Sequence, residues 1–242
     1  MPDAIFAHPR LAPIYDVFDS DRGDLAAYCA IVDDLEAGLV LDVGCGTGSL
    51  AILLAGRGRT VVGVDPAGAS LDVAKAKDHA AQVRWILGTV AAVPPIEADL
   101  ATMTGNVAQV FLTDDDWAQT LQGIHGALRS TGRLVFETRR PDYRAWEEWA
   151  EERRPVVRDV PGSGPVERRL EVLTVDLPFV SFRYAYRFLV DGAVITSEST
   201  LRFRSRDEVE ASLNATGYRV LDVREAPDRP GREFVFIAER ST

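Results

Sequence analysis

The sequence predicts an α/β protein built on a doubly wound, mostly parallel sheet, and three observations lead to this prediction. Between Leu39 and about Thr138, short apolar runs rich in β-branched residues alternate with longer helical patterns, which is typical of parallel βαβ units. The pattern then changes to long segments of alternating apolar and polar residues, which is typical of antiparallel strands. A last helical pattern and two more strand-like runs close the chain. We therefore expect a seven-stranded sheet with an antiparallel β insertion between its fifth strand and its last helix.

Five strands and three helices are expected in the parallel part. The strand candidates are Leu39–Val43, Thr60–Val64, Val83–Leu87, Asp99–Met103 and Arg133–Thr138. The helix candidates are Gly48–Gly56, Ala67–Ala76 and Asp114–Leu128. In the last of these helices Asp114 is a good N-cap residue, and the segment Ser130–Gly132 supplies a glycine that can close the helix.

The second part begins with a charged helical stretch at Tyr143–Arg154 and continues as a meander. Its strands are expected at Val166–Leu177, Val180–Val190 and Val194–Phe203, with Asp191–Gly192 as a hairpin turn. The chain then closes with a helix at Asp207–Ala215 and strands at Tyr218–Val223 and Arg232–Glu239. Four aromatic residues share one face of the middle strand, namely Phe182, Tyr184, Tyr186 and Phe188. They fit core packing, a homodimer interface or the lining of a substrate site.

Composition limits the function classes. The formal net charge of -10 opposes general binding to nucleic acid, because neutralising phosphates requires a basic surface. The segment from Arg153 to Arg206 nevertheless carries ten arginines against six acids, which fits either a solvated sheet face or an anionic substrate. No apolar run is long enough to span a bilayer, and the N-terminus has no secretion signal, so we expect a cytoplasmic protein. Two cysteines and three histidines at no ligand spacing predict no metal site.

The segment Val40–Leu50 carries the chemistry. It reads as a buried strand that ends at Asp42 and runs into a turn with Gly44, Gly46 and Gly48. Glycine suits this turn because it adopts positive φ and lets a ligand approach the backbone. A dinucleotide fingerprint would need Gly or Ala at Ser49, so the spacing favours a ligand without a pyrophosphate.

A second acid follows at the end of the next strand. Asp65 closes the run Val61–Val64, and a carboxylate at the end of the second strand of such a sheet accepts hydrogen bonds from ribose hydroxyls. The alternatives are a helix N-cap for Asp65 and a turn residue for Asp42.

Asp42–Leu50 together with Val62–Pro66 resembles motifs I and II of the class I S-adenosylmethionine-dependent methyltransferases. The resemblance covers roughly Leu39 to Thr138 and the closing strands, and implies a Rossmann-like sheet with S-adenosyl-L-methionine as cofactor. The cofactor residues it implies are Asp42, Gly44, Cys45, Gly46, Gly48, Asp65, Pro66, Gly88, Thr89, Val90, Asn106 and Tyr15. Many members have Gly-Asp after the third strand, where this chain has Gly88-Thr89, which leaves adenine recognition to a hydroxyl or to backbone groups.

The resemblance also implies a division of the chain. Residues 1–30 are expected to form a helical lid, and residues 31–140 plus 206–242 the cofactor-binding methyltransferase domain. Residues 141–205 would be the insertion, serving as substrate cover or dimerisation surface.

The expected reaction is methyl transfer to a small-molecule acceptor by in-line displacement, for which the protein mainly orients the acceptor and excludes water. The candidate substrate residues are His8, Asn106 and Arg139, and Asn106 fits a simple turn equally well. An anionic acceptor would explain Arg139. No general base is evident, so amine, hydroxyl and carbon acceptors stay open.

Two other classes share these features. A nicotinamide-dependent oxidoreductase would use the same fold and ribose acid, and Ser49 argues against it. A non-catalytic module that binds the cofactor is the second alternative, and an RNA methyltransferase ranks third.

Overall fold

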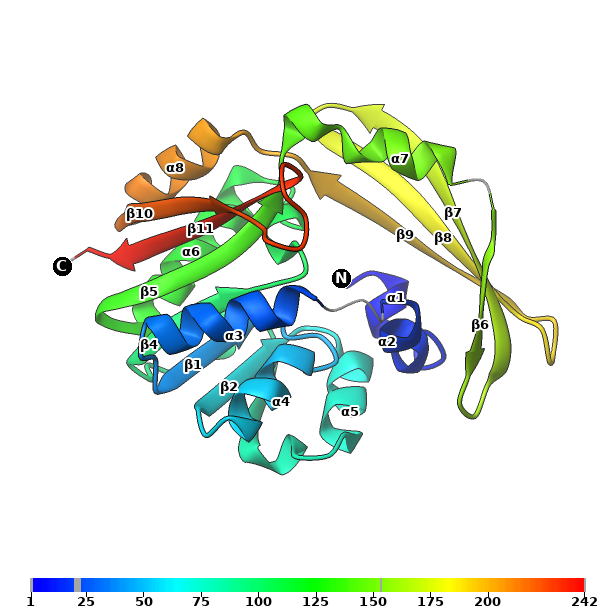
Figure 1. Cartoon of the computed structure of the whole chain (residues 1–242), viewed down its shortest axis with the longest axis horizontal. Coiled ribbons are helices and arrows are strands. Elements are labelled where there is room, and N and C mark those ends of the chain that lie inside the picture. The colour runs from blue at the N-terminus through cyan, green and yellow to red at the C-terminus, as the bar shows by residue number, and fades with distance from the viewer. Residues whose placement is uncertain (1, 20–22, 153, 242) are drawn as a thin grey trace.

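The computed structural model describes residues 2–19, 23–152 and 154–241. A seven-stranded sheet in the order β10-β11-β5-β4-β1-β2-β3 forms its centre (Figure 1). Its strands are β1 (Leu39–Val43), β2 (Thr60–Asp65), β3 (Val83–Leu87), β4 (Ala98–Met103), β5 (Leu128–Arg139), β10 (Tyr218–Glu225) and β11 (Glu233–Arg240). β1 to β5 run parallel, whereas β11 pairs antiparallel with both β5 and β10. The predicted fold class is confirmed.

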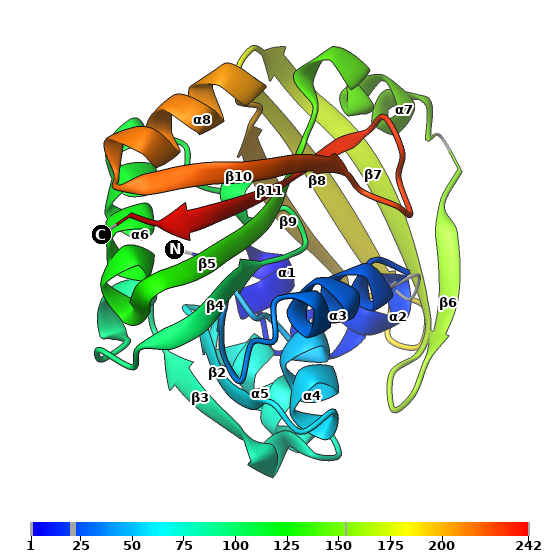
Figure 2. The ribbon, with the colours of Figure 1, turned by 60° about the vertical axis from the view of Figure 1, so that its left-hand side comes forward.

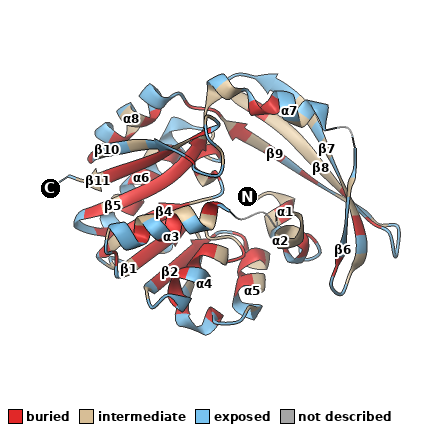
Figure 3. Ribbon diagram, in the orientation of Figure 1, coloured by how far each residue is buried: buried red, intermediate tan, exposed pale blue. Residues whose placement is uncertain are grey.

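Helices cover both faces of this sheet. On one face α3 (Asp24–Asp34) and α4 (Ser49–Gly56) pack against the apolar residues of β1, β4 and β5. On the other face α6 (Asp114–Ala127) and α8 (Arg206–Ala215) bury Trp117 against the same strands. Burial is concentrated in these central strands (Figure 3).

The remaining helical segments are α5 (Gly68–Ala76) and several short pieces. The short α-helices are α1 (Ala4–Ala7), α2 (Tyr15–Phe18) and α7 (Ala145–Glu151). The 3-10 turns are η1 (Ala12–Ile14), η2 (Ala80–Gln82), η3 (Val90–Ala92), η4 (Val107–Gln109) and η5 (Pro141–Tyr143).

Both ends of α6 differ from the prediction. The N-cap is Thr113, whose hydroxyl accepts a hydrogen bond from the Asp116 backbone N–H, so the expected cap Asp114 is the first helical residue. At the other end the helix stops at Ala127 and Leu128 already begins β5. The segment Ser130–Gly132 is an irregularity inside β5, because pairing moves from Leu128 to Arg133 while β4 advances only from Ala98 to Leu100.

A second, antiparallel sheet of four strands has the order β6-β7-β8-β9. Its strands are β6 (Val156–Val160), β7 (Gly164–Asp176), β8 (Phe179–Phe188) and β9 (Val194–Arg202). The sequence did not predict β6, since Arg158 and Asp159 interrupt its short apolar run. The helix expected at Tyr143–Arg154 is divided into η5 and α7 by Arg144, which takes positive φ, and Arg153 lies outside the described residues.

The N-terminal segment, residues 2–19, lies between the two sheets in both ribbon views (Figures 1 and 2). Ile5 and Ile14 pack against Tyr186 and Phe188 on the inner face of β8. Tyr184 packs against the same core and Phe182 packs against the cluster around Trp146, although both are only partly buried. Core packing therefore involves all four aromatic residues, and Tyr186 and Phe188 are fully buried by it. Across the described residues, no helix is both long enough and apolar enough to cross a membrane.

Candidate functional site

The turn after β1 joins the ends of three neighbouring strands. Asp42, which is 1% exposed, accepts a hydrogen bond from the Thr102 hydroxyl of β4 at 3.0 Å. The backbone N–H of Gly44 donates to the Val64 carbonyl of β2 at 2.8 Å. The two acids predicted from the strand ends therefore lie on adjacent parallel strands, at the edge where open α/β sheets bind ligands.

The three glycines of the turn all have positive φ, but their surroundings differ. A Cβ on Gly44 would lie 2.7 Å from Val107, and one on Gly48 would lie 2.5 Å from the Trp85 ring. These two glycines are needed for packing of the protein itself. A Cβ on Gly46 would meet nothing within 4 Å, so open space for a ligand lies over this residue.

Asp65 holds the turn from the β2 side. Its Oδ2 accepts from the Gly46 backbone N–H at 2.8 Å, and its Oδ1 accepts from the Ala67 N–H at 2.7 Å. Burial raises the pKa of Asp65, and the two backbone N–H groups oppose that rise. Each carboxylate oxygen has a further lone pair, so the group can accept from ligand hydroxyls while it holds the turn.

The other expected cofactor residues differ in where their side chains lie and in how far they are buried. Cys45 directs its sulfur toward Gly63 of β2, and burial raises the pKa of its thiol. Gly88 donates its N–H to the Asp65 carbonyl at 3.0 Å, which brings the end of β3 to the site. Pro66, which follows Asp65, and Thr89, which follows Gly88, are both exposed. Val90 is buried against the core.

The N-terminal segment is tied to the turn by contacts that the sequence did not predict. The Thr47 hydroxyl donates to Asp16 Oδ1 at 2.6 Å, and Lys77 Nζ lies 2.6 Å from Asp16 Oδ2. Tyr15, the expected cofactor residue of this segment, packs its ring against Phe6. The only signal for Asp16 is that it follows Tyr15 in the expected lid.

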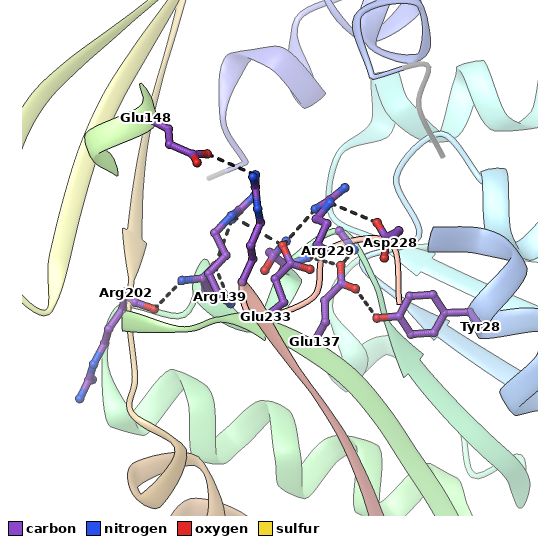
Figure 4. A network of polar contacts seen from close by, with 12 residues as sticks. Tyr28, Glu137, Arg139, Glu148, Arg202, Asp228, Arg229 and Glu233 are labelled. Carbon is purple, nitrogen blue, oxygen red and sulfur yellow. Dashed lines mark hydrogen bonds and ion pairs between the residues drawn. The ribbon is translucent and has the colours of Figure 1, made fainter. Parts of the chain in front are cut away.

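A buried polar network lies beside this edge, where β5 ends and β11 begins (Figure 4). Glu137 accepts hydrogen bonds from the Tyr28 hydroxyl of α3 and from the backbone N–H groups of Gly105 and Asn106. Asn106 has positive φ and donates its side-chain amide to Glu233 at 3.2 Å, while its buried Oδ1 has no hydrogen-bond partner. The turn interpretation of Asn106 thus applies, and its amide also joins the network.

Burial sets the protonation of this network. It raises the pKa of Glu137, and the nearby Glu233 raises it further, while the hydrogen bonds from Tyr28 and Gly105 oppose the rise. Burial and the Glu137 carboxylate likewise raise the pKa of Tyr28. Arg229 donates to Glu233 at 3.0 Å and supplies the compensating charge. Glu137, a carboxylate directly after the apolar run Leu134–Phe136, was the one sequence signal for this network.

The two expected substrate residues outside the turn lie apart from it. Arg139 donates to Gln109 Oε1 at 3.1 Å, stands 3.9 Å from Glu233 and lies over the Trp149 ring. Arg139 therefore has protein partners in the network, and burial lowers its pKa. His8 ends α1, and its Nδ1 accepts from the Arg10 N–H at 3.1 Å.

A pocket of about 430 Å³ opens between α7 and strands β7 and β8, with Trp149, Leu170 and Val172 among its lining residues. None of its lining residues belongs to the turn or to the ends of β1, β2 or β4, so the strand-end edge, and not this pocket, is the candidate cofactor site. In the part of the chain that the structure describes, no three His, Cys, Asp or Glu side chains form a group that could hold a metal.

Comparisons with known proteins agree with this geometry. Residues 40–132 match the family model described as "Methyltransferase domain". An uncharacterised methyltransferase of Oceanobacillus iheyensis is 29% identical over 135 residues, which is 52% of this chain and 62% of that protein. The chain thus matches about three fifths of the length of this curated relative.

Two solved structures share nearly the whole fold. An S-adenosylmethionine-dependent methyltransferase from Clostridium acetobutylicum superposes with a TM-score of 0.76 at 16% identity, covering 96% of this chain and 98% of the other. The sugar N-methyltransferase from Streptoalloteichus sp. has a TM-score of 0.74 at 18% identity, covering 94% and 93%. At these identities the likeness concerns the fold.

Proposed function

Because the chain belongs to the class I S-adenosylmethionine-dependent methyltransferases, we propose that it transfers the methyl group of S-adenosylmethionine to a small-molecule acceptor. The observation that supports this most directly is the open space over Gly46, which lies between two buried strand-end carboxylates. A ligand with a cationic end and a ribose suits that arrangement.

The residues of the turn would hold the cofactor as follows. The Gly46 backbone lies against the ligand, Asp65 accepts from the ribose hydroxyls, and Asp42 favours the cationic methionine end directly or through water. Gly88 and the Thr89 hydroxyl border the adenine side. When bound, the cofactor supplies an electrophilic methyl group, so no strong acid or base is required for its departure.

The other elements orient the acceptor and exclude water. In-line displacement requires the acceptor atom to lie opposite the breaking bond, so alignment contributes most of what the protein adds. Residues 2–19 cover the turn through Asp16 and Thr47 and contact the four-stranded sheet on their other side. We assign residues 2–19 as the lid in place of the expected 1–30, because α3 (Asp24–Asp34) packs in the core of the main sheet. We assign α3 and the rest of residues 31–140, plus 206–242, as the methyltransferase domain, and the insertion as the acceptor cover.

Three further expectations stay predictions. An anionic acceptor is supported by the excess of arginine in the insertion. A homodimer through the insertion would have to use residues other than Tyr186 and Phe188, because these pack against the chain's own N-terminal segment. Light scattering coupled to gel filtration checks that assembly, and cell fractionation checks the cytoplasmic location.

Calorimetric titration with S-adenosylhomocysteine and with NAD tests the proposed function. We expect binding of S-adenosylhomocysteine alone, and a loss of roughly 2–4 kcal/mol in its binding free energy for Asp65→Ala, since a charged acceptor is removed from two hydroxyls. Asp222→Asn, on the exposed edge strand β10, is the control and should leave affinity unchanged. Binding of NAD in preference would support the oxidoreductase instead, and turnover of an acceptor panel separates an enzyme from a cofactor-binding module.

A further inference from the structure

Arg168 of β7 lies on the inner face of the four-stranded sheet. Its guanidinium carbon stands 5.1 Å from the centroid of the Phe18 ring and 4.8 Å from that of the Tyr184 ring. One ring comes from α2 and the other from β8, so the cation is held between the N-terminal segment and the insertion. Aromatic faces on two sides fix the plane of a guanidinium and leave its N–H edge available.

Arg168 is a half-buried arginine of this sheet without a carboxylate partner, whereas Arg158 and Arg187, which also lack one, are exposed to solvent. Three other arginines of the sheet are ion-paired, in the pairs Arg169–Glu167 (2.9 Å), Arg183–Glu198 (2.6 Å) and Arg202–Asp114 (2.8 Å). Among the described residues no carboxylate lies within ion-pair distance of Arg168, and its buried Nε has no hydrogen-bond partner. The Tyr186 hydroxyl is a hydrogen-bond partner of the Arg168 guanidinium, but no carboxylate compensates its charge. A partly buried cation without a counter-charge is costly, and an anionic ligand would reduce that cost.

The position of Arg168 links it to the methyl-transfer site. Phe18 follows Asp16 by two residues on the same short helix, and Asp16 accepts from Thr47 of the Gly-rich turn. Arg168 and Arg139, at the end of β5, both lie within electrostatic range of Tyr184. Arg168 therefore lies beside the segment that contacts the Gly-rich turn.

We infer that Arg168 binds an oxyanion group of the methyl acceptor, a carboxylate or a phosphate, with Phe18 and Tyr184 holding the guanidinium in place. This inference rests on the proposed function, because it requires the acceptor to lie beside the lid. Arg168 of the insertion thus replaces Arg139 as the proposed anion-binding residue, because Arg139 already has Gln109 and Glu233 as partners.

The test uses the full chain saturated with S-adenosylhomocysteine and three small aryl probes: benzoate, phenyl phosphate and benzamide. Their dissociation constants are measured by ligand-detected NMR titration. We expect benzoate or phenyl phosphate to bind about tenfold or more tightly than benzamide, because a charge-assisted hydrogen bond distinguishes them. Which of the two anions binds better identifies the group as carboxylate or phosphate.

Variants connect the preference to this side chain. Arg168→Met should reduce the ratio of the benzamide dissociation constant to that of the better-binding anion to about one. Arg168→Lys, which keeps the charge, should retain part of the wild-type ratio. Arg187→Met is the matched control, because Arg187 is exposed on the opposite face of the same sheet, and it should keep the wild-type ratio. Unchanged affinity for S-adenosylhomocysteine verifies that each variant is folded.

Two results would overturn the inference: no preference for anions in the wild-type protein, or a preference that survives Arg168→Met. Either result with normal S-adenosylhomocysteine binding leaves the proposed function standing. If the wild-type protein does not bind S-adenosylhomocysteine, the proposed function fails first and the inference fails with it.

Discussion

Single residues explain why the Gly-rich turn can hold a ligand. Gly44 and Gly48 are confined by Val107 and Trp85, so they allow the turn to pack on its own neighbours. Gly46 is the one glycine of the three with open space at its Cβ position, and its N–H is held by Asp65. A substitution at Gly46 should therefore affect ligand binding more than the packing of the protein.

We predict that Gly46→Ala abolishes measurable binding of S-adenosylhomocysteine while costing only about 1–2 kcal/mol of stability, because its left-handed backbone disfavours a Cβ. Gly192→Ala is the matched control, since Gly192 has positive φ and nothing within 4 Å of the added Cβ, but lies in the β8–β9 hairpin. Calorimetry and urea denaturation of both variants make the comparison. Equal affinity in the two variants would contradict the assignment of the turn.

For single residues, the sequence predicted which strand ends carry the acids better than it predicted which side chains contact one another. Asp42 and Asp65 were found from strand ends, because strand geometry places such residues at one edge of a parallel sheet. The separate roles of the three glycines depend on Val107 and Trp85, which are distant in sequence. The contact between Asp16 and Thr47 likewise depends on where the N-terminal segment packs.

Among the secondary-structure elements, β5 connects most parts of the site. Its residue Glu137 receives hydrogen bonds from α3 and from the loop after β4, and its neighbour Arg139 reaches Gln109 in η4. Three elements are thus positioned by one strand. Glu137 and Glu233 lie close together on β5 and β11, and this proximity makes the network sensitive to protonation.

We predict a pH-dependent stability difference between the wild-type protein and Glu137→Gln. The pKa of Glu137 is raised on folding, so its contribution to the free energy of unfolding is fully present below the unfolded value and is lost as the pH rises through the folded pKa. Wild-type stability minus variant stability should therefore fall as the pH rises above about 4, where the unfolded carboxyl becomes ionised. Urea denaturation at a series of pH values above this point measures the difference.

Asp222→Asn serves as a control in which the stability difference changes with pH in the opposite direction. Arg224 lowers the pKa of exposed Asp222, so that carboxylate stabilises above the unfolded pKa and loses its effect on acidification. The control difference should be small, because the pair is exposed, and confined to pH below about 4. If the Glu137 difference does not decrease toward neutral pH, the carboxylate is not held in the environment described here.

The length of an element decides how well the sequence pattern predicts it. The long periodic strands β7, β8 and β9 were predicted to within a few residues, because alternation over many positions is unambiguous. The five-residue β6 carries two exposed charges and gives no such signal. The Ser130–Gly132 segment contains good helix-ending residues, yet its place inside β5 follows from pairing with β4, a long-range contact.

In the whole molecule, residues 2–19 join two sheets that otherwise have separate cores. On one side Ser199 donates to Asp3 at 2.6 Å and the Ile5 N–H donates to Ser197 at 2.9 Å. On the other side the segment contacts the Gly-rich turn and α5. The cofactor would have to pass this segment to reach or leave the turn.

We predict that the double variant Ser197→Ala and Ser199→Ala raises the dissociation rate of S-adenosylhomocysteine about fivefold or more, since it removes two hydrogen bonds of about 1 kcal/mol each. Stopped-flow displacement measures the rate. Ser181→Ala is the control, because Ser181 bonds Thr200 within the sheet and does not contact the segment. A rate that is the same in both variants would show that the segment does not retain the ligand.

The position of residues 2–19 also has a consequence for the order of events in time. The turn lies beneath this segment and the inner face of the four-stranded sheet lies beyond it, so the cofactor must load before the acceptor is enclosed. The spent cofactor would then leave last, after the methylated product. The residence time of the spent cofactor would then depend on a segment that contributes no reacting atom.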